Sequence, residues 1–155
     1  TADAFLDPIR RGAQKAGRSM SEIDIQVGGR LRFGDVEPVL PEIKRRLAFS
    51  VGAMGSTKSN FYNAAYRRAG YAEMAEDVQT LWQAGRQDAA IAAVPDELAV
   101  KTGFLGSEQM VLDRMRAYRD AGVTTLRLDP AGETPTERLD TLARGLDLLR
   151  RVDAE

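Results

Sequence analysis

Two short segments of the chain, positions 22–27 and 123–128, alternate apolar with polar residues and therefore predict half-buried strands. The apolar residues of the first segment are Ile23, Ile25 and Val27. In the second segment Leu126 and Leu128 share a face that suits packing against helices, which leaves Arg127 on the opposite face, near the carboxyl end of the strand. Ligands of parallel α/β folds bind at that end, so Arg127 is a candidate binding residue; an ion pair with a carboxylate explains it equally well.

Gly28 and Gly29 follow the first predicted strand and lead into Arg30 and Arg32. Paired glycines allow a backbone to approach a phosphate, but the spacing of the known dinucleotide and P-loop motifs is absent. We therefore favour a strand that continues or kinks through the glycines. If the strand continues, Arg30 lies on the same face as Asp24, and Arg32 follows it toward the carboxyl end.

Most of the remaining chain has helical periodicity. The segments whose apolar residues recur at helical spacing are 2–16, 37–51, 61–70, 71–84, 87–94, 96–100 and 107–121. Gly103 and Gly106 are expected to bound a short loop. A last helix starts at a capping box, with Thr134 as the cap and Glu137 as its partner. The apolar stripe of this helix, which we expect to pack on a sheet rather than to form a dimer seam, consists of Leu139, Leu142, Leu146 and Leu149.

Positions 52–60 form a break before an aromatic-rich helix that starts near Phe61. The free N–H groups at a helix N-terminus attract anions, and this break supplies hydroxyl and ammonium donors, Lys58 among them. A plain helix cap explains the same residues and is the favoured interpretation. Lys58 and Asn60 are kept as candidate binding residues.

Composition narrows the chemistry. The chain has 155 residues, which fits one domain, and its net charge of -1 gives no basic excess for binding nucleic acid. It has no apolar run long enough for a membrane span and no signal-peptide pattern, and the absence of cysteine is compatible with a cytoplasmic protein. Because histidine is absent as well, His/Cys metal sites and Ser-His or Cys-His nucleophiles are excluded. No metal site and no catalytic residue is assigned, so a cofactor or residues outside the chain are expected to carry any reactive step.

The order of the predicted elements indicates an incomplete sheet. Two strands joined through helices should be parallel, and parallel strands are normally buried inside larger sheets. Two strands alone leave open edges, so we expect either an intermolecular sheet in a homo-oligomer or an N-terminal half supplied elsewhere. The chain therefore resembles a late piece of a larger βα protein. Its first residue is Thr1 rather than methionine, which is compatible with cleavage or truncation.

Five segments in a fixed order carry a family resemblance. They are FSVGAMG at 49–55, NFYN at 60–63, AGY at 69–71, AVPDEL at 93–98 and AGVTTLRL at 121–128. In this order they resemble the C-terminal half of the luciferase-like flavin and deazaflavin oxidoreductases, closest to the branch that uses coenzyme F420. The resemblance implies an α/β fold, a helix-rich partial (β/α) TIM barrel that keeps the last two strands. The implied domain is a single partial one over 1–155, with a helical insertion at about 35–106.

The same resemblance implies hydride transfer between a reduced deazaflavin and a small organic substrate, with coenzyme F420 as the cofactor and FMN as the alternative. As a complete barrel the protein would be an oxidoreductase, and this segment alone would be inactive. A monooxygenase that uses FMN and a non-catalytic, oligomerising helical module are the alternative functions. The residues placed along the barrel as candidates for cofactor or substrate binding are Arg30, Arg32, Lys58, Asn60, Arg127 and Asp129.

Overall fold

The computed structural model describes residues 3–55 and 59–155, with side-chain surroundings from residue 6 onward. Its helices are α1 (Asp3–Lys15), α2 (Leu40–Gly52), α3 (Phe61–Arg68), α4 (Ala72–Gln83), α5 (Gln87–Ala92), α6 (Asp96–Lys101), α7 (Glu108–Asp120) and α8 (Pro135–Asp153), with single 3-10 turns η1 (Met20–Glu22) and η2 (Glu37–Val39). Its strands are β1 (Gln26–Phe33), β2 (Phe104–Gly106) and β3 (Thr125–Pro130). Contacts divide the chain into two compact units, a helical unit (Thr1–Met20 with Leu40–Ala99) and a sheet unit (Ser21–Val39 with Val100–Glu155).

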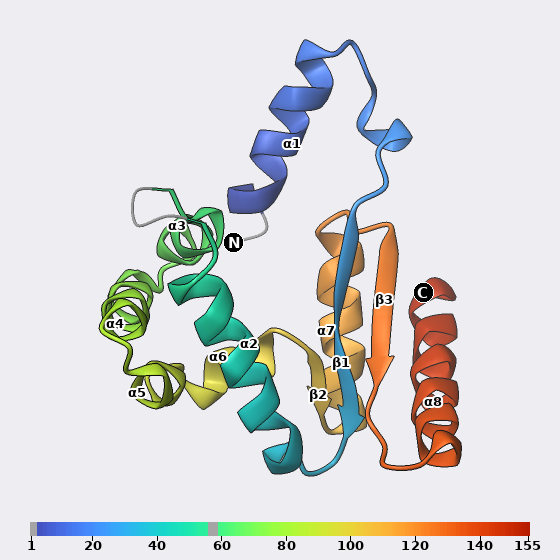
Figure 1. Ribbon diagram of the computed structural model, residues 1–155. Helices are drawn as coiled ribbons and strands as arrows, with labels where there is room; N and C mark the ends of the chain where they lie inside the picture. The colour runs from blue at the N-terminus through green and yellow to red at the C-terminus, as the bar shows by residue number, and fades with distance from the viewer. Residues whose placement is uncertain (1–2, 56–58) are drawn as a thin grey trace. The chain divides into compact units, whose positions relative to one another are not determined.

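The sheet unit contains a parallel sheet in the order β2-β1-β3, which confirms an α/β fold with parallel strands (Figure 1). β1 runs through both glycines to Phe33, so the continuing strand is confirmed. The predicted start near Glu22 is wrong, because Met20–Glu22 form a 3-10 turn before β1 begins. β3 likewise begins at Thr125 rather than at Val123.

The loop predicted between Gly103 and Gly106 is wrong, because Phe104–Gly106 form strand β2. β2 pairs with the carboxyl end of β1, Phe104 opposite Leu31 and Gly106 opposite Phe33. Three residues are too few to display an alternating pattern, and glycines on both sides resemble turn signals. The sheet therefore has three strands among the described residues, where the sequence predicts two.

One face of the sheet packs against α7 and α8. Leu31 is fully buried there, and the core around it is formed by Phe104, Val111, Leu112, Met115, Leu148 and Val152. Leu126 and Leu128 pack against the same core, as the alternation of β3 predicts. The predicted leucine stripe of α8 is partly wrong: Leu139 is 66% and Leu146 40% exposed. The buried residues of α8 are instead Gly145, Leu148 and Val152.

The predicted cap of the last helix is confirmed, and the helix before it is capped as well. The Ser107 side chain accepts a hydrogen bond from the backbone N–H of Met110 at the start of α7. At α8 the Thr134 hydroxyl accepts from the N–H of Glu137, and the Glu137 carboxylate accepts from the N–H of Thr134, which is the reciprocal capping box. These caps fix where each helix leaves the sheet.

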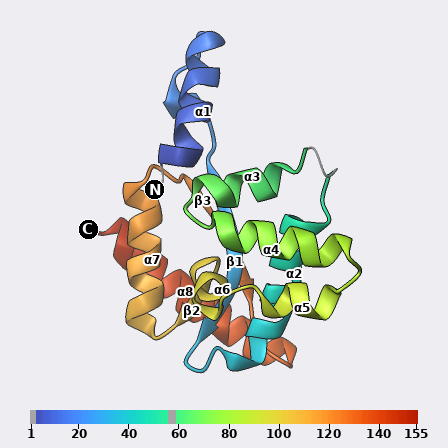
Figure 2. The same ribbon diagram turned by 90° about the vertical axis from the view of Figure 1, so that its left-hand side faces the viewer.

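The helical unit contains α1 to α5, and α6 begins in it (Figure 2). Its core is built from small residues of α2, α4 and α5, with Val51 and Val78 fully buried. Trp82 packs at the edge of this core, and its ring lies edge-on to Phe49 with 5.9 Å between the ring centres. In the described part of the chain, no helix has the length and apolar character needed to cross a membrane.

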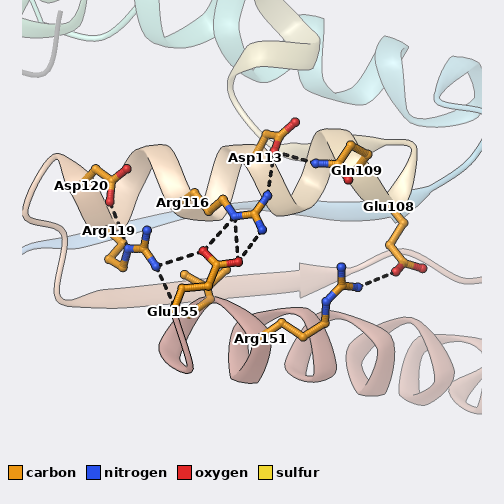
Figure 3. A network of polar contacts seen from close by, with 9 residues as sticks. Glu108, Gln109, Asp113, Arg116, Arg119, Asp120, Arg151 and Glu155 are labelled. Atoms are coloured by element: carbon orange, nitrogen blue, oxygen red, sulfur yellow. Dashed lines mark hydrogen bonds and ion pairs between the residues drawn. The ribbon is translucent and has the colours of Figure 1, made fainter.

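An ion-pair network joins α7 to the residues after α8 (Figure 3). Arg116 and Arg119, one turn apart on α7, both pair with the Glu155 carboxylate. The Arg116 Nε lies 3.0 Å from Glu155 Oε2, and Arg119 also donates to the backbone oxygen of Val152. The hydrogen bond from Arg116 lowers the pKa of the Glu155 carboxyl below its ordinary value.

We expect the stabilisation from Glu155 to be lost in acid. Because the folded-state pKa of Glu155 is lowered, its contribution is present above the carboxyl pKa of the unfolded chain and disappears as the pH falls through the folded-state value. Thermal melts of the wild type and of Glu155→Gln should therefore differ at pH 7 and converge once the pH falls below the folded-state pKa of Glu155. A difference that stays constant across this range would show that Glu155 acts through packing instead.

Candidate functional site

The second face of the sheet is polar. Because Leu31 points into the core, the alternate positions of β1, including Arg30 and Arg32, point to the opposite face. Arg127 and Asp129 occupy the same face of β3, since Leu126 and Leu128 pack into the core. The residues on this polar face are Gln26, Gly28, Arg30, Arg32, Thr125, Arg127 and Asp129. Four of the six sequence-predicted binding residues therefore lie on one face, with three guanidinium groups and one carboxylate among them.

Arg30 and Asp129 form an ion pair across the two strands. They are opposite each other in the β1–β3 register, and the Arg30 Nη1 lies 3.1 Å from Asp129 Oδ2. Arg30 is only 23% exposed, and its Nε is buried with no hydrogen-bond partner in the described structure. A buried donor without a partner carries a desolvation cost that a bound acceptor would relieve.

Arg127 has a different environment from Arg30. It is exposed, and no acidic side chain within the described ranges pairs with it. It lies opposite Gly28 in the register, and a Cβ added at Gly28 would be 2.8 Å from Arg127 Nε and 2.9 Å from its Nη2. The guanidinium group therefore lies over the glycine. The ion pair that the sequence allows for Arg127 is formed instead by Arg30.

Arg32 stands where the polar face meets a hollow at the carboxyl end of β1. Its Nε donates to the backbone oxygen of Asp35 in the turn that follows the strand. The hollow has a volume of about 270 Å³ and lies between the end of β1, the loop after β3 and the first turns of α8. On its wall the Arg144 guanidinium sits 4.1 Å from the centre of the Phe33 ring, a cation–π contact. No sequence pattern points to Arg144, because this contact joins residues that are far apart in the chain.

Asn60, the fifth candidate, is a buried helix cap in the helical unit. Its Oδ1 accepts from the backbone N–H of Asn63, and its Nδ2 donates to the backbone oxygens of Ser50 and Val51. The side chain is therefore fully used within the fold, which agrees with the plain cap favoured for this segment. Lys58, the sixth candidate, lies outside the described residues.

We expect Asn60→Ala to destabilise the helical unit by about 1 to 2 kcal/mol, because it removes a cap and one donor from each of two carbonyl oxygens. The Val51 oxygen keeps the Asn63 amide as a donor. Asn60→Asp should also destabilise the helical unit. It keeps the oxygen that accepts the cap hydrogen bond, but it replaces the amide donor with a carboxylate oxygen that repels the two carbonyl oxygens. Fluorescence of Trp82, the only tryptophan of the chain, reports denaturant unfolding of this unit. If Asn60→Asp unfolded at the same denaturant concentration as the wild type, the role assigned to the amide would be wrong.

The described residues of the polar face carry charged groups that can bind a ligand. No group of three or more acidic side chains there is arranged to hold a metal ion, and the chain has no histidine or cysteine. Guanidinium groups suit phosphate and carboxylate oxygens, and this face carries three of them. The polar face can therefore hold an anionic ligand against the sheet.

Comparison with known proteins shows which family model and which proteins the chain resembles. The family model for luciferase-like monooxygenases matches residues 1–125. A protein of Mycobacterium tuberculosis, whose assignment as a coenzyme F420-dependent oxidoreductase is itself provisional, is 37% identical over 84 residues, 54% of this chain and 24% of its own length. The structure of the coenzyme F420-dependent tetrahydromethanopterin reductase from Methanopyrus kandleri is similar in fold, with a TM-score of 0.63 and 22% identity over 97% of this chain and 42% of that chain. The chain thus spans less than half of either protein.

Proposed function

Because the chain belongs to the luciferase-like monooxygenase family, we propose that it is the C-terminal part of a coenzyme F420-dependent oxidoreductase. The whole protein would transfer a hydride between reduced deazaflavin and a small organic substrate. The observation that carries the proposal within this chain is the polar face of the sheet, where Arg30 and Arg32 lie toward the carboxyl end of β1. Arg127 lies on the adjacent parallel strand β3, opposite Gly28 and so in the middle of the face rather than near the carboxyl end that the sequence predicts. Both similar proteins named above are described as F420-dependent, which favours this cofactor over FMN.

In this proposal the sheet unit is a segment of a (β/α) barrel. β1 and β3 would be its last two strands, the helices from α2 to α6 the insertion between them, and the outer edge of β3 would pair with a strand from the remainder of the protein. The alignment of nearly the whole chain with 42% of the reductase chain supports a partial barrel. The polar face of the sheet would then face the barrel interior, and the α7 and α8 face its outer layer.

The residues present fit an anionic cofactor. The buried Arg30 Nε lacks an acceptor, and Gly28 leaves room beside Arg127. When bound, the deazaflavin supplies the hydride chemistry. The work of this chain is to hold an anionic group: Arg127 would pair with a phosphate or carboxylate, Arg32 would close the carboxyl end of the site, and Asp129 keeps Arg30 on the sheet.

Equilibrium titration tests the proposal. The intrinsic fluorescence of F420 should change on addition of this chain, and Arg127→Gln should weaken the binding about tenfold, because a charge-assisted contact is removed. Arg151→Gln, whose ion pair with Glu108 lies on the helices, is the matched control and should bind as the wild type does. Preference for FMN in the same titration would support the flavin monooxygenase alternative, and absence of both interactions would contradict the proposed function.

Self-association of a non-catalytic module is the second candidate function. Two observations favour it: Leu139 and Leu146 are exposed on α8, and no strand among the described residues pairs with the outer edge of β3. Light scattering at increasing protein concentration separates the two proposals. A stable homo-oligomer that binds no F420 would support the module, and a monomer with a cooperative melt would oppose it.

A further inference from the structure

The two consecutive glycines of β1 have different neighbours. A Cβ at Gly29 would lie 2.7 Å from the backbone oxygen of Thr102 and 2.9 Å from the Cα of Gly103, so backbone packing requires glycine there. A Cβ at Gly28 would meet no backbone atom within that range. Its nearest neighbours are all side-chain atoms of Arg127, namely Nε at 2.8 Å, Nη2 at 2.9 Å and Cβ at 3.0 Å.

Glycine inside a strand weakens the strand, since it has no side chain to pack and loses more backbone entropy on folding. At Gly29 the close backbone approach accounts for this weakness. At Gly28 the three atoms nearest to an added Cβ all belong to the Arg127 side chain, and two of them are guanidinium nitrogens. A larger residue could be accepted by the fold, because the obstructing atoms are mostly the end of a flexible side chain, but it would displace Arg127.

The pairing of β1 with β3 gives Arg30 and Arg127 different neighbours. Arg30 faces Asp129 and is neutralised by it, with 3.1 Å between Nη1 and Oδ2. Arg127 faces Gly28, is exposed, and has no acidic partner among the described side chains. An exposed guanidinium beside a neutralised pair leaves one net positive charge at the middle of the polar face. This charge can bind an oxyanion, either a free ion or an anionic group of a larger ligand.

We infer that Gly28 is a positioning residue that keeps the Arg127 guanidinium over the strand and available to an oxyanion ligand, a phosphate or a carboxylate, while the ion pair with Asp129 holds Arg30 on the sheet. This inference deepens the proposed function and rests on it for the identity of the ligand, but not for the binding of the oxyanion itself. Arg127 is the residue that touches the ligand, and Gly28 acts only through Arg127.

Inorganic phosphate is the probe for the test, at low ionic strength, with binding followed through the backbone amide signals of this chain in NMR spectra. In the wild type, phosphate should shift the signals of Gly28 and Arg127. Arg127→Gln should weaken phosphate binding about tenfold and Gly28→Ala about fivefold, since one charge-assisted contact is lost or misplaced. Gly12→Ala, in a helix where nothing lies within 4 Å of the added methyl, is the matched control and should bind as the wild type does.

The double variant decides whether Gly28 acts through Arg127. If it does, Gly28→Ala should have no further effect on phosphate binding in the Arg127→Gln background. Equal losses in both backgrounds, or wild-type binding by Gly28→Ala, would overturn the inference. Phosphate binding without F420 binding would refute the proposed function and leave the role of Gly28 standing. F420 binding with no phosphate shift at Gly28 or Arg127 would refute the role of Gly28 and leave the proposed function standing.

Discussion

Replacing Leu31 with alanine should lower the free energy of unfolding of the sheet unit by about 3 to 5 kcal/mol. Leu31 is fully buried in the central strand and contacts the core formed by β2, α7 and α8. The substitution would remove the most buried side chain of β1 and leave a cavity among the core residues that surround it. Amide hydrogen exchange in β1 and β3 measures the effect on this unit directly.

Trp82 provides an internal control for this prediction, because it lies in the helical unit and its fluorescence follows that unit separately. Leu146→Ala, on the exposed side of α8, is the matched variant and should change stability by less than about 0.5 kcal/mol. If Leu31→Ala and Leu146→Ala had similar effects on hydrogen exchange, the assigned core would be wrong.

Gly145→Val should destabilise the sheet unit by about 3 kcal/mol. A Cβ at Gly145 would lie 2.6 Å from Leu31 Cδ2 and 3.4 Å from Leu128 Cδ1, so α8 rests on the sheet through this glycine. Because Leu31 is fully buried, its side chain has no free space into which to move. The same measurement of hydrogen exchange in β1 and β3 applies.

Gly12→Val is the matched variant for Gly145→Val. Gly12 lies within α1, is exposed, and has nothing within 4 Å of an added Cβ. Valine is slightly better than glycine in a helix, so this variant should be neutral or slightly stabilising. A destabilisation of Gly145→Val no larger than that of Gly12→Val would mean that α8 does not pack on Leu31.

The positions of the strands follow from the sequence better than their ends do. The alternation of Leu126 and Leu128 correctly predicts which face of β3 is buried, because a period of two is fixed by strand geometry. The same alternation extends to Ile23, which precedes the first paired residue of β1. There the side chain of Asp24 accepts hydrogen bonds from the Thr124 and Thr125 hydroxyls, which lower its carboxyl pKa, and side-chain bonding replaces ladder pairing.

The face of α8 is mispredicted for a reason that concerns glycine. The helical spacing of the leucines predicts that Leu139 and Leu146 are buried, but both are exposed. The closest contact with the sheet is made by Gly145, which carries no hydrophobic signal in the sequence. Its importance depends on the distance between α8 and Leu31, a tertiary property that helical periodicity does not contain.

In the candidate site, too, strand periodicity predicts which residues share a face, but the contacts between strands depend on the tertiary structure. The strand period places Arg30 and Arg32 on one face, and the structure adds Arg127 and Asp129 to that face through the pairing of β1 with β3. Which arginine is neutralised could not be predicted, because that depends on Arg30 rather than Arg127 lying opposite Asp129. Asn60, in contrast, proves to be a cap whose hydrogen bonds are all directed into the fold.

The most direct test of the account is a residue-by-residue map of F420 on this chain, obtained from backbone amide NMR shifts during titration. We predict shifts concentrated at Gly28, Arg127 and Asp129 on the polar face of the sheet, with the amides around Asn60 unchanged. Shifts confined to the helical unit, or no saturable shifts at any F420 concentration, would contradict the claim that this face of the sheet holds the cofactor.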